Sequence, residues 1–180
     1  MSDPDPDHGV SASLERAFAE HRAHVDEVLR GGNPDEIKRL YVELGELLDD
    51  ALEGDPGSAP VLSLPETGEA EDHFGFSVRG TGGKQKGLLW AWNERVVPKK
   101  PRVPNPGVIA VRVANQHEKQ MLIAADPAKF FTEPHYNGFP AVLVRLEAID
   151  VAELKELITD AWRCLAPRSL VKTFDQGPNP

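Results

Sequence analysis

The sequence predicts an α+β fold: an N-terminal α-helical hairpin, then an antiparallel sheet of about five strands packed by a long C-terminal helix. Two patterns indicate this order. Apolar residues recur at alternating steps of three and four along residues 14–51, which is the spacing of one helix face. From residue 73 they instead alternate with polar residues in short segments, as in strands, until helical spacing returns after residue 150. Strands and helices in separate runs are typical of α+β proteins.

The N-terminal third is predicted to form two antiparallel helices behind a disordered tail. Residues 1–9 contain too few apolar side chains to offset the entropy of ordering. Within residues 10–56 the two apolar stripes consist of Leu14, Phe18, His21, Val25 and Val28, and of Ile37, Leu40, Leu44, Leu47 and Ala51. Asn33 and Pro34 suit the start of the second helix. A linker rich in proline and glycine, residues 55–60, ends this acidic hairpin.

Residues 57–176 are predicted to form one α+β domain, with a short tail at 177–180. The expected strands are residues 73–79, 87–93, 107–113, 119–124 and 141–146. A polar turn at Asn115 is expected between the third and fourth strands, and Asp126 is expected to begin a brief helix through Phe131. Asp150 and Glu153 form a capping box for the long last helix.

Negative charge is concentrated at the N-terminus. The 180 residues contain 29 acids and 20 bases, a net charge of −9. Residues 1–56 hold 15 of the acids and 5 of the bases, so they carry −10, and the remaining 14 acids and 15 bases give +1. The larger part of the chain can therefore approach a polyanion, despite the acidic total.

Composition also excludes several classes of protein. Cys164 is the only cysteine, so neither an intramolecular disulfide nor a multi-cysteine metal cage can form. Apolar runs reach about five residues, whereas a membrane span needs about 18. The acidic, proline-rich start lacks the pattern of a signal peptide. We expect a soluble, cytoplasmic protein that makes no membrane contact and holds no cofactor and no metal.

A basic segment between Arg79 and Arg102 is the strongest electrostatic feature of the sequence. It combines a glycine-rich loop, residues 80–86, with a proline-rich loop, residues 98–106, whose four prolines favour a stiff, extended backbone. The candidate phosphate-binding residues are Lys84, Lys86, Arg95, Lys99, Lys100 and Arg102. Cations of this kind bind phosphates without reading base sequence. Two alternatives stay open: the charges serve solubility alone, or they bind an acidic protein.

A second candidate site is the loop around Glu133, His135 and Tyr136. A carboxylate near an imidazole can tune it for acid–base chemistry, and binding residues often lie in loops. Hydrogen bonding within a turn explains the same residues without chemistry. Trp90 and Trp92 share one phase of a strand and Trp162 lies on an apolar helix face, so these three are expected to pack in the core.

Short motifs in the last two thirds of the chain resemble the MmcQ/YjbR family. They are Leu64-Pro-Glu-Thr67, Phe76-Ser-Val-Arg79, Val108-Ile-Ala-Val-Arg-Val113, Asp126-Pro127 with Phe130-Phe131, Pro134-His-Tyr-Asn-Gly-Phe-Pro140, Val142-Leu-Val-Arg-Leu146, Ile149-Asp150, Glu153-Leu154, Ala161-Trp-Arg163 and Ala166-Pro167. The resemblance covers residues 61–174. It implies a frataxin-like (CyaY-like) antiparallel sheet and DNA binding through two wings, and it brings no catalytic residues. The hairpin lies outside it.

The sequence therefore favours a DNA-binding protein that is not an enzyme. In this interpretation the basic loops contact phosphates nonspecifically, and the acidic hairpin competes with DNA for them. The first alternative is a protein-interaction or regulatory module that uses the hairpin and residues 134–140 to bind a partner or a second copy. The second is a small-ligand binder or enzyme at Glu133, His135 and Tyr136.

Overall fold

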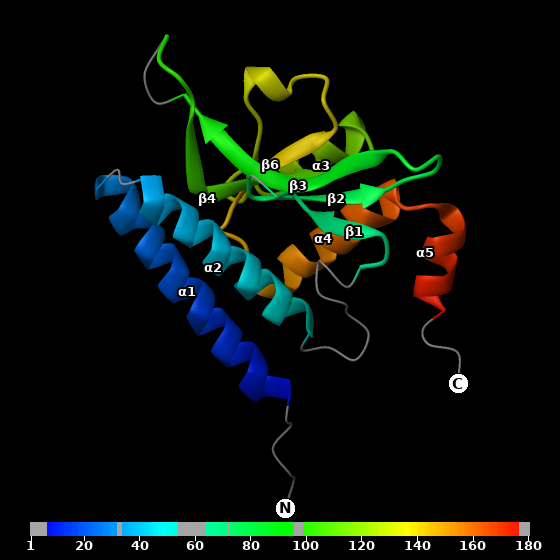
Figure 1. The fold of residues 1–180 in the computed structure, drawn as a ribbon, viewed down its shortest axis with the longest axis horizontal. Helices are drawn as coiled ribbons and strands as arrows, with labels where there is room; N and C mark the ends of the chain where they lie inside the picture. Colours follow the sequence, from blue (N-terminus) through cyan, green and yellow to red (C-terminus); the bar gives the residue numbers. More distant parts are fainter. Residues whose placement is uncertain (1–6, 32–33, 54–63, 72, 96–98, 177–180) are drawn as a thin grey trace, which may run out of the picture.

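The structure, a computed structural model, describes residues 7–31, 34–53, 64–71, 73–95 and 99–176 (Figure 1). The elements in chain order are α1 (Asp7–Gly31), α2 (Pro34–Glu53), β1 (Thr67–Glu69), β2 (Gly75–Arg79), β3 (Gln85–Glu94), β4 (Val103–Arg112), α3 (Gln116–Ala125), β5 (Phe130–Phe131), the 3-10 turn η1 (Pro134–Tyr136), β6 (Ala141–Arg145), α4 (Val151–Leu165) and α5 (Arg168–Asp175). The strands pair antiparallel in the order β1-β2-β3-β4-β6-β5. The α+β class is confirmed, with six strands rather than about five.

Each face of the sheet has its own apolar cluster. On one face, strand residues such as Val78 and Ile109 pack with Leu154 and Trp162 of α4 and with Phe18 of α1. The smaller cluster on the other face consists of Trp92, Val108, Ala110, Tyr136, Ala141 and Leu143. Figure 1 shows α1, α2 and α4 below the sheet and the segment around η1 above it. The three tryptophans lie in these clusters or against them, as expected.

The β3–β4 hairpin extends beyond the rest of the sheet as a two-stranded ribbon. Pairing jumps from Ala91 opposite Ile109 to Trp92 opposite Asn105, so residues 106–108 of β4 form a bulge without partners in β3, although Val108 still pairs with Arg145 of β6. Beyond this bulge β6 no longer pairs with β4. Pro104 can therefore lie in the ribbon, since its missing N–H interrupts no ladder on that side. Part of the expected proline-rich loop is thus strand, and residues 96–98 lie outside the described residues.

Two predicted elements between β4 and β6 are wrong. Residues 119–124, expected as a strand, belong to helix α3, because Asn115 caps a helix instead of forming a turn: its Oδ1 accepts from the Glu118 N–H at 3.0 Å. Residues 126–131 do not form a helix. The Asp126 carboxylate accepts from the N–H groups of Ala128 and Lys129, which closes a turn, and β5 follows. The short elements β1, β5, η1 and α5 were not predicted.

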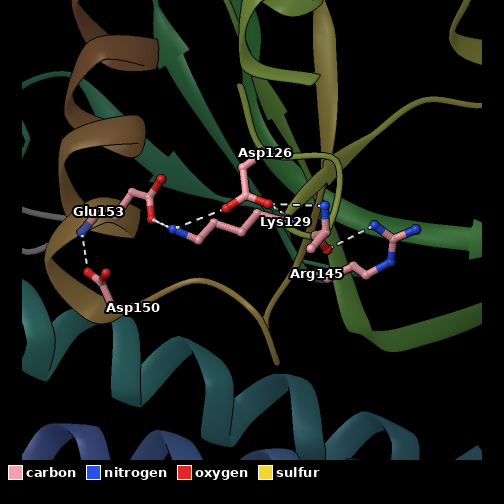
Figure 2. A network of polar contacts seen from close by, with 6 residues as sticks. Asp126, Lys129, Arg145, Asp150 and Glu153 are labelled. Carbon is pink, nitrogen blue, oxygen red and sulfur yellow. Dashed lines mark hydrogen bonds and ion pairs between the residues drawn. The ribbon is translucent and has the colours of Figure 1, made fainter. Parts of the chain in front are cut away.

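A polar network joins that turn to the start of α4 (Figure 2). Lys129 Nζ lies 3.6 Å from Asp126 Oδ2 and also donates to Glu153, and the hydrogen bond to Glu153 raises the pKa of Lys129. Asp150 Oδ1 accepts from the Glu153 N–H at 2.8 Å, which is the N-cap bond of the predicted capping box. Arg145 Nη1 donates to the Ala128 carbonyl at 3.0 Å. These contacts fix the β5 edge of the sheet against α4.

The N-terminal helices are docked onto the domain. Buried residues of the predicted stripes include Phe18, Val25, Leu40 and Leu44, whereas the side chains of Leu14 and Ala51 lie outside the described residues. Glu15 Oε1 accepts from the Val151 N–H at 3.1 Å, at the first turn of α4. The domain boundaries, including the tails at 1–9 and 177–180, stay predictions. No helix in the described ranges is long and apolar enough to cross a membrane.

Acid is expected to destabilise the hairpin through His21. Its side chain is 2% exposed between α1 and α2, and its Nδ1 lies 3.5 Å from Glu43 Oε2. Burial lowers the pKa of His21 from 6.5, although Glu43 opposes this; His24 and Arg22 lower it further. Below a pH of about 6.5 the unfolded chain therefore binds more protons than the folded chain. The free energy of unfolding decreases as the pH is lowered through this range.

Urea unfolding at several pH values between about 8 and 5.5 checks this expectation. A His21→Leu variant is expected to lose part of the pH dependence below 6.5. His117→Leu is the matched control, because His117 is exposed on α3. A His21→Leu chain whose unfolding free energy keeps the full pH dependence would contradict the argument.

Candidate nucleic-acid interface

One group of predicted cations lies at the end of the β3–β4 ribbon, which we call the ribbon end: Arg95, Lys99, Lys100 and Arg102. Lys99 and Lys100 are exposed, and Lys99 has a φ of +66°, a conformation of the left-handed region that suits a tight turn. Arg95 Nη1 donates to the Lys100 carbonyl at 3.2 Å. No carboxylate of the described residues pairs with Lys99 or Lys100. The turn therefore presents two free ammonium groups to solvent.

Arg102 has a different role from its neighbours. Its Nη1 lies 2.6 Å from Glu133 Oε1 and 3.0 Å from the Asn93 carbonyl. The side chains of Arg102 and Glu133 are only 28% and 20% exposed. Since a half-buried, hydrogen-bonded ion pair is costly to break, Arg102 holds the ribbon against the segment before η1. Of the predicted phosphate ligands, Arg102 is the one that forms an ion pair with a carboxylate of the described residues.

The second group lies in the glycine-rich loop between β2 and β3. Gly82 and Gly83 have φ values of +81° and +75°, so the turn uses the freedom of glycine. Lys84 and Lys86 are exposed, and the aliphatic part of Lys86 lies over Gly80, where an added Cβ would be 3.0 Å from Lys86 Cε. No ion pair to either lysine occurs within the part of the chain that the structure describes.

The two basic groups lie at opposite ends of β3. This strand has ten residues, and at about 3.3 Å per residue it separates the groups by roughly 30 Å. Figure 1 shows the ribbon and the β2–β3 turn projecting from opposite sides of the sheet. The sequence placed these cations in one basic segment; in the structure they form two separate sites.

The predicted loop site does not gather around one reactive centre. Glu133 pairs with Arg102, whereas the Tyr136 hydroxyl accepts from Trp90 Nε1 at 3.0 Å on the face of the sheet. Burial raises the pKa of Tyr136, and His135 is exposed, edge-on to the Tyr136 ring at 5.8 Å. The three side chains therefore make three different kinds of contact.

Lys119, a cation that the sequence analysis did not single out, holds this loop through two hydrogen bonds. Lys119 of α3 is 1% exposed, and its Nζ donates to the carbonyls of Tyr136 at 2.8 Å and Phe139 at 3.4 Å. Burial lowers the pKa of Lys119. Arg112 was missed as well: it lies over the Phe139 ring at 4.6 Å and donates to the Gly87 carbonyl. Lys119 lies in a helix and Arg112 lies in a strand, whereas the sequence analysis considered charged residues in loops.

The fold defines a class: an α+β protein with one antiparallel sheet. The YjbR family model matches residues 62–164, and the chain belongs to the YjbR family, as the motifs indicated. The uncharacterized proteins Rv2570 and MT2646 of Mycobacterium tuberculosis and Mb2600 of Mycobacterium bovis are each 49% identical to it over 114 residues, which is 63% of this chain and 88% of each relative. No solved structure matches the chain, and the frataxin-like comparison stays a prediction.

Proposed function

We propose that this protein binds double-stranded DNA nonspecifically through phosphate contacts at the two basic groups. The observation that carries the proposal is the presentation of Lys99 and Lys100 at the tip of a projecting ribbon, free of any carboxylate among the described residues. Free lysines on a projecting hairpin contact a polyanion at little desolvation cost. Each phosphate contact releases counterions, which favours binding without sequence readout.

The separation of the two groups supports one molecule lying along one duplex. Roughly 30 Å between the ribbon end and the glycine-rich loop is close to one turn of B-DNA, which is about 34 Å. In this arrangement β3 runs along the duplex, Lys99 and Lys100 contact one stretch of backbone, and Lys84 and Lys86 contact the next. Arg95 and Arg102 shape the ribbon end through their bonds to carbonyl oxygens.

The proposal assigns binding and no catalytic step to this chain, and it places the protein in the cytoplasm with the DNA. Glu133 and Tyr136 are held by Arg102 and Trp90, which suits a structural role better than proton transfer. The acidic helices α1 and α2 lie on the face of the sheet opposite η1 (Figure 1). Their charge limits the affinity for DNA at low salt, because like charges on ligand and protein repel.

Fluorescence anisotropy of a labelled random duplex of about 24 base pairs, titrated with the full chain at several salt concentrations, tests the proposal. Four lysines that each neutralise one phosphate give a slope of about −3.6 in a plot of log affinity against log salt. A duplex of about 8 base pairs is too short for both groups, so its slope is expected to be about half as steep. Absence of binding even at low salt would refute DNA binding.

A further inference from the structure

A cavity of about 410 Å³ lies where α1 meets the base of the β3–β4 ribbon. Its floor is the bulge of β4 at residues 106–108, and Val25 of α1 closes against it: an added Cβ on Gly107 would lie 3.4 Å from Val25 Cγ1. Trp92 and Phe131 contribute two aromatic walls at 87° to each other, with ring centroids 5.6 Å apart. The volume is within the range of small-molecule sites, about 300–1,000 Å³.

A polar group without a partner is buried in this wall. Trp92 Nε1 has no hydrogen-bond partner among the described residues, whereas His21 Nδ1 contacts Glu43 Oε2 at 3.5 Å. The other two tryptophans have partners: Trp90 Nε1 donates to the Tyr136 hydroxyl and Trp162 Nε1 donates to the Pro65 carbonyl. Unpartnered buried polar groups are uncommon in native proteins, and the Trp92 indole N–H is such a group in a residue that lines this cavity, which favours a ligand there.

Two guanidinium groups line the cavity and have unused donors. Arg22 Nη1 makes one long bond to the Leu146 carbonyl at 3.4 Å, and Arg145 Nη1 donates to carbonyls while its guanidinium lies 4.0 Å from the Phe131 ring centroid. No described carboxylate pairs with either. Two acids also line the cavity: Glu94, whose Oε2 accepts from the Asn105 amide at 2.9 Å, and Glu147, which is exposed. Two guanidinium groups beside two carboxylates favour a ligand with a single negative charge over a phosphate dianion.

We propose that this cavity binds a small planar aromatic carboxylate, with the ring packed against the cavity-facing surfaces of Trp92 and Phe131 and the carboxylate on the free N–H groups of Arg22 and Arg145. Guanidinium groups bind carboxylates through paired, charge-assisted hydrogen bonds. The aromatic walls supply the apolar surface that a ring needs. This site is independent of the DNA-binding proposal, since neither Lys99 nor Lys84 takes part in it.

The site needs both parts of the chain. His21, Arg22, Ala23 and Val25 come from α1, outside the segment that matches the YjbR family, while the other lining residues, such as Trp92 and Phe131, come from within it. The cavity is therefore a property of the extended chain. Ligand binding there is expected to depend on α1 as much as on the sheet.

Proton–nitrogen NMR spectra of the tryptophan indoles of the full chain test the proposal, with benzoate, 2-naphthoate and indole-3-acetate as probes. A Trp92→Phe variant identifies the Trp92 signal by its loss. We expect at least one probe to shift that signal saturably while the Trp90 and Trp162 signals stay in place. If none of the three probes shifts the Trp92 signal at about 10 mM, the proposal is overturned. A site with a dissociation constant well above this concentration has little binding free energy.

The charge assignment has its own controls. Indole-3-acetamide, the neutral counterpart of indole-3-acetate, is expected to bind at least tenfold more weakly, and this comparison uses the unaltered protein. Arg22→Met is expected to weaken carboxylate binding about tenfold or more, whereas Arg16→Met, the same change on an exposed arginine of α1, leaves it unchanged. Equal affinity for acid and amide would overturn the carboxylate assignment.

Discussion

Replacing Trp162 with alanine is expected to lower the free energy of unfolding by about 3–5 kcal/mol, the usual cost of deleting a large buried aromatic side chain. Trp162 has no exposed surface, lies at the centre of the cluster between α4 and the sheet, and contacts the Phe174 ring of α5 at 4.8 Å. Its Nε1 donates to the Pro65 carbonyl at 2.9 Å. The change therefore loosens α4, α5 and the segment before β1 together.

Chemical denaturation followed by far-ultraviolet circular dichroism measures this effect. Trp162→Phe separates the two contributions, because it keeps most of the ring and removes the donor to Pro65; we expect a loss of about 1–2 kcal/mol. If Trp162→Ala is too unstable to purify, Trp162→Phe still reports the hydrogen bond. A loss below about 1 kcal/mol for the alanine variant would show that the packing around Trp162 contributes little.

Reversing the charges of Lys99 and Lys100 is expected to reduce DNA affinity at low salt by about two orders of magnitude. The double variant Lys99→Glu, Lys100→Glu removes two phosphate contacts and places two carboxylates beside the backbone. Each removed contact flattens the slope of log affinity against log salt by about 0.9. Both side chains are exposed and the turn is held by Arg95 and Arg102, so the fold is expected to persist.

Arg168→Glu with Lys172→Glu is the matched control for that variant. Both residues lie on α5 and are exposed, and their reversal changes the net charge by the same amount. Anisotropy titrations of both double variants against the same duplex distinguish a local contact from a general charge effect. Equal losses in the two variants would remove the ribbon end from the interface.

The elements that could be predicted from sequence are those with local signals. Helix α4 has a cap and an apolar face within one stretch of chain, and the structure reproduces both, while the Glu153 carboxylate of the predicted capping box pairs with Lys129. Helix α3 carried a comparable signal, Asn115 followed by Glu118, but the apolar run after Met121 favoured a strand. The two-residue strand β5 exists only through pairing with Leu143 and Val144, which no local pattern reveals.

The candidate site was predictable in composition and not in arrangement. The exposure of the lysines could be predicted because they lie in expected loops. The ion pair between Arg102 and Glu133 could not be predicted in this way, because it joins positions 31 residues apart. The cavity depends on the bulge at residues 106–108 and on Arg22 of α1, a residue more than 80 positions earlier in the chain. Contacts of this kind, between residues far apart in the sequence, depend on tertiary packing. The periodicity and spacing of residues in the sequence do not predict them.

The way α1 is tied to the domain has a consequence for synthesis on the ribosome. Glu15 bonds to Val151 and Arg22 to Leu146, so the first helix of the chain completes its contacts with residues made near the end. The β2, β3 and β4 hairpins join neighbours in sequence and can form while the chain is still being made. Helices α1 and α2 can pack against each other early, through Val25, Val28 and Leu40, but the bonds of α1 to Leu146 and Val151 form only after β6 and the start of α4 have emerged.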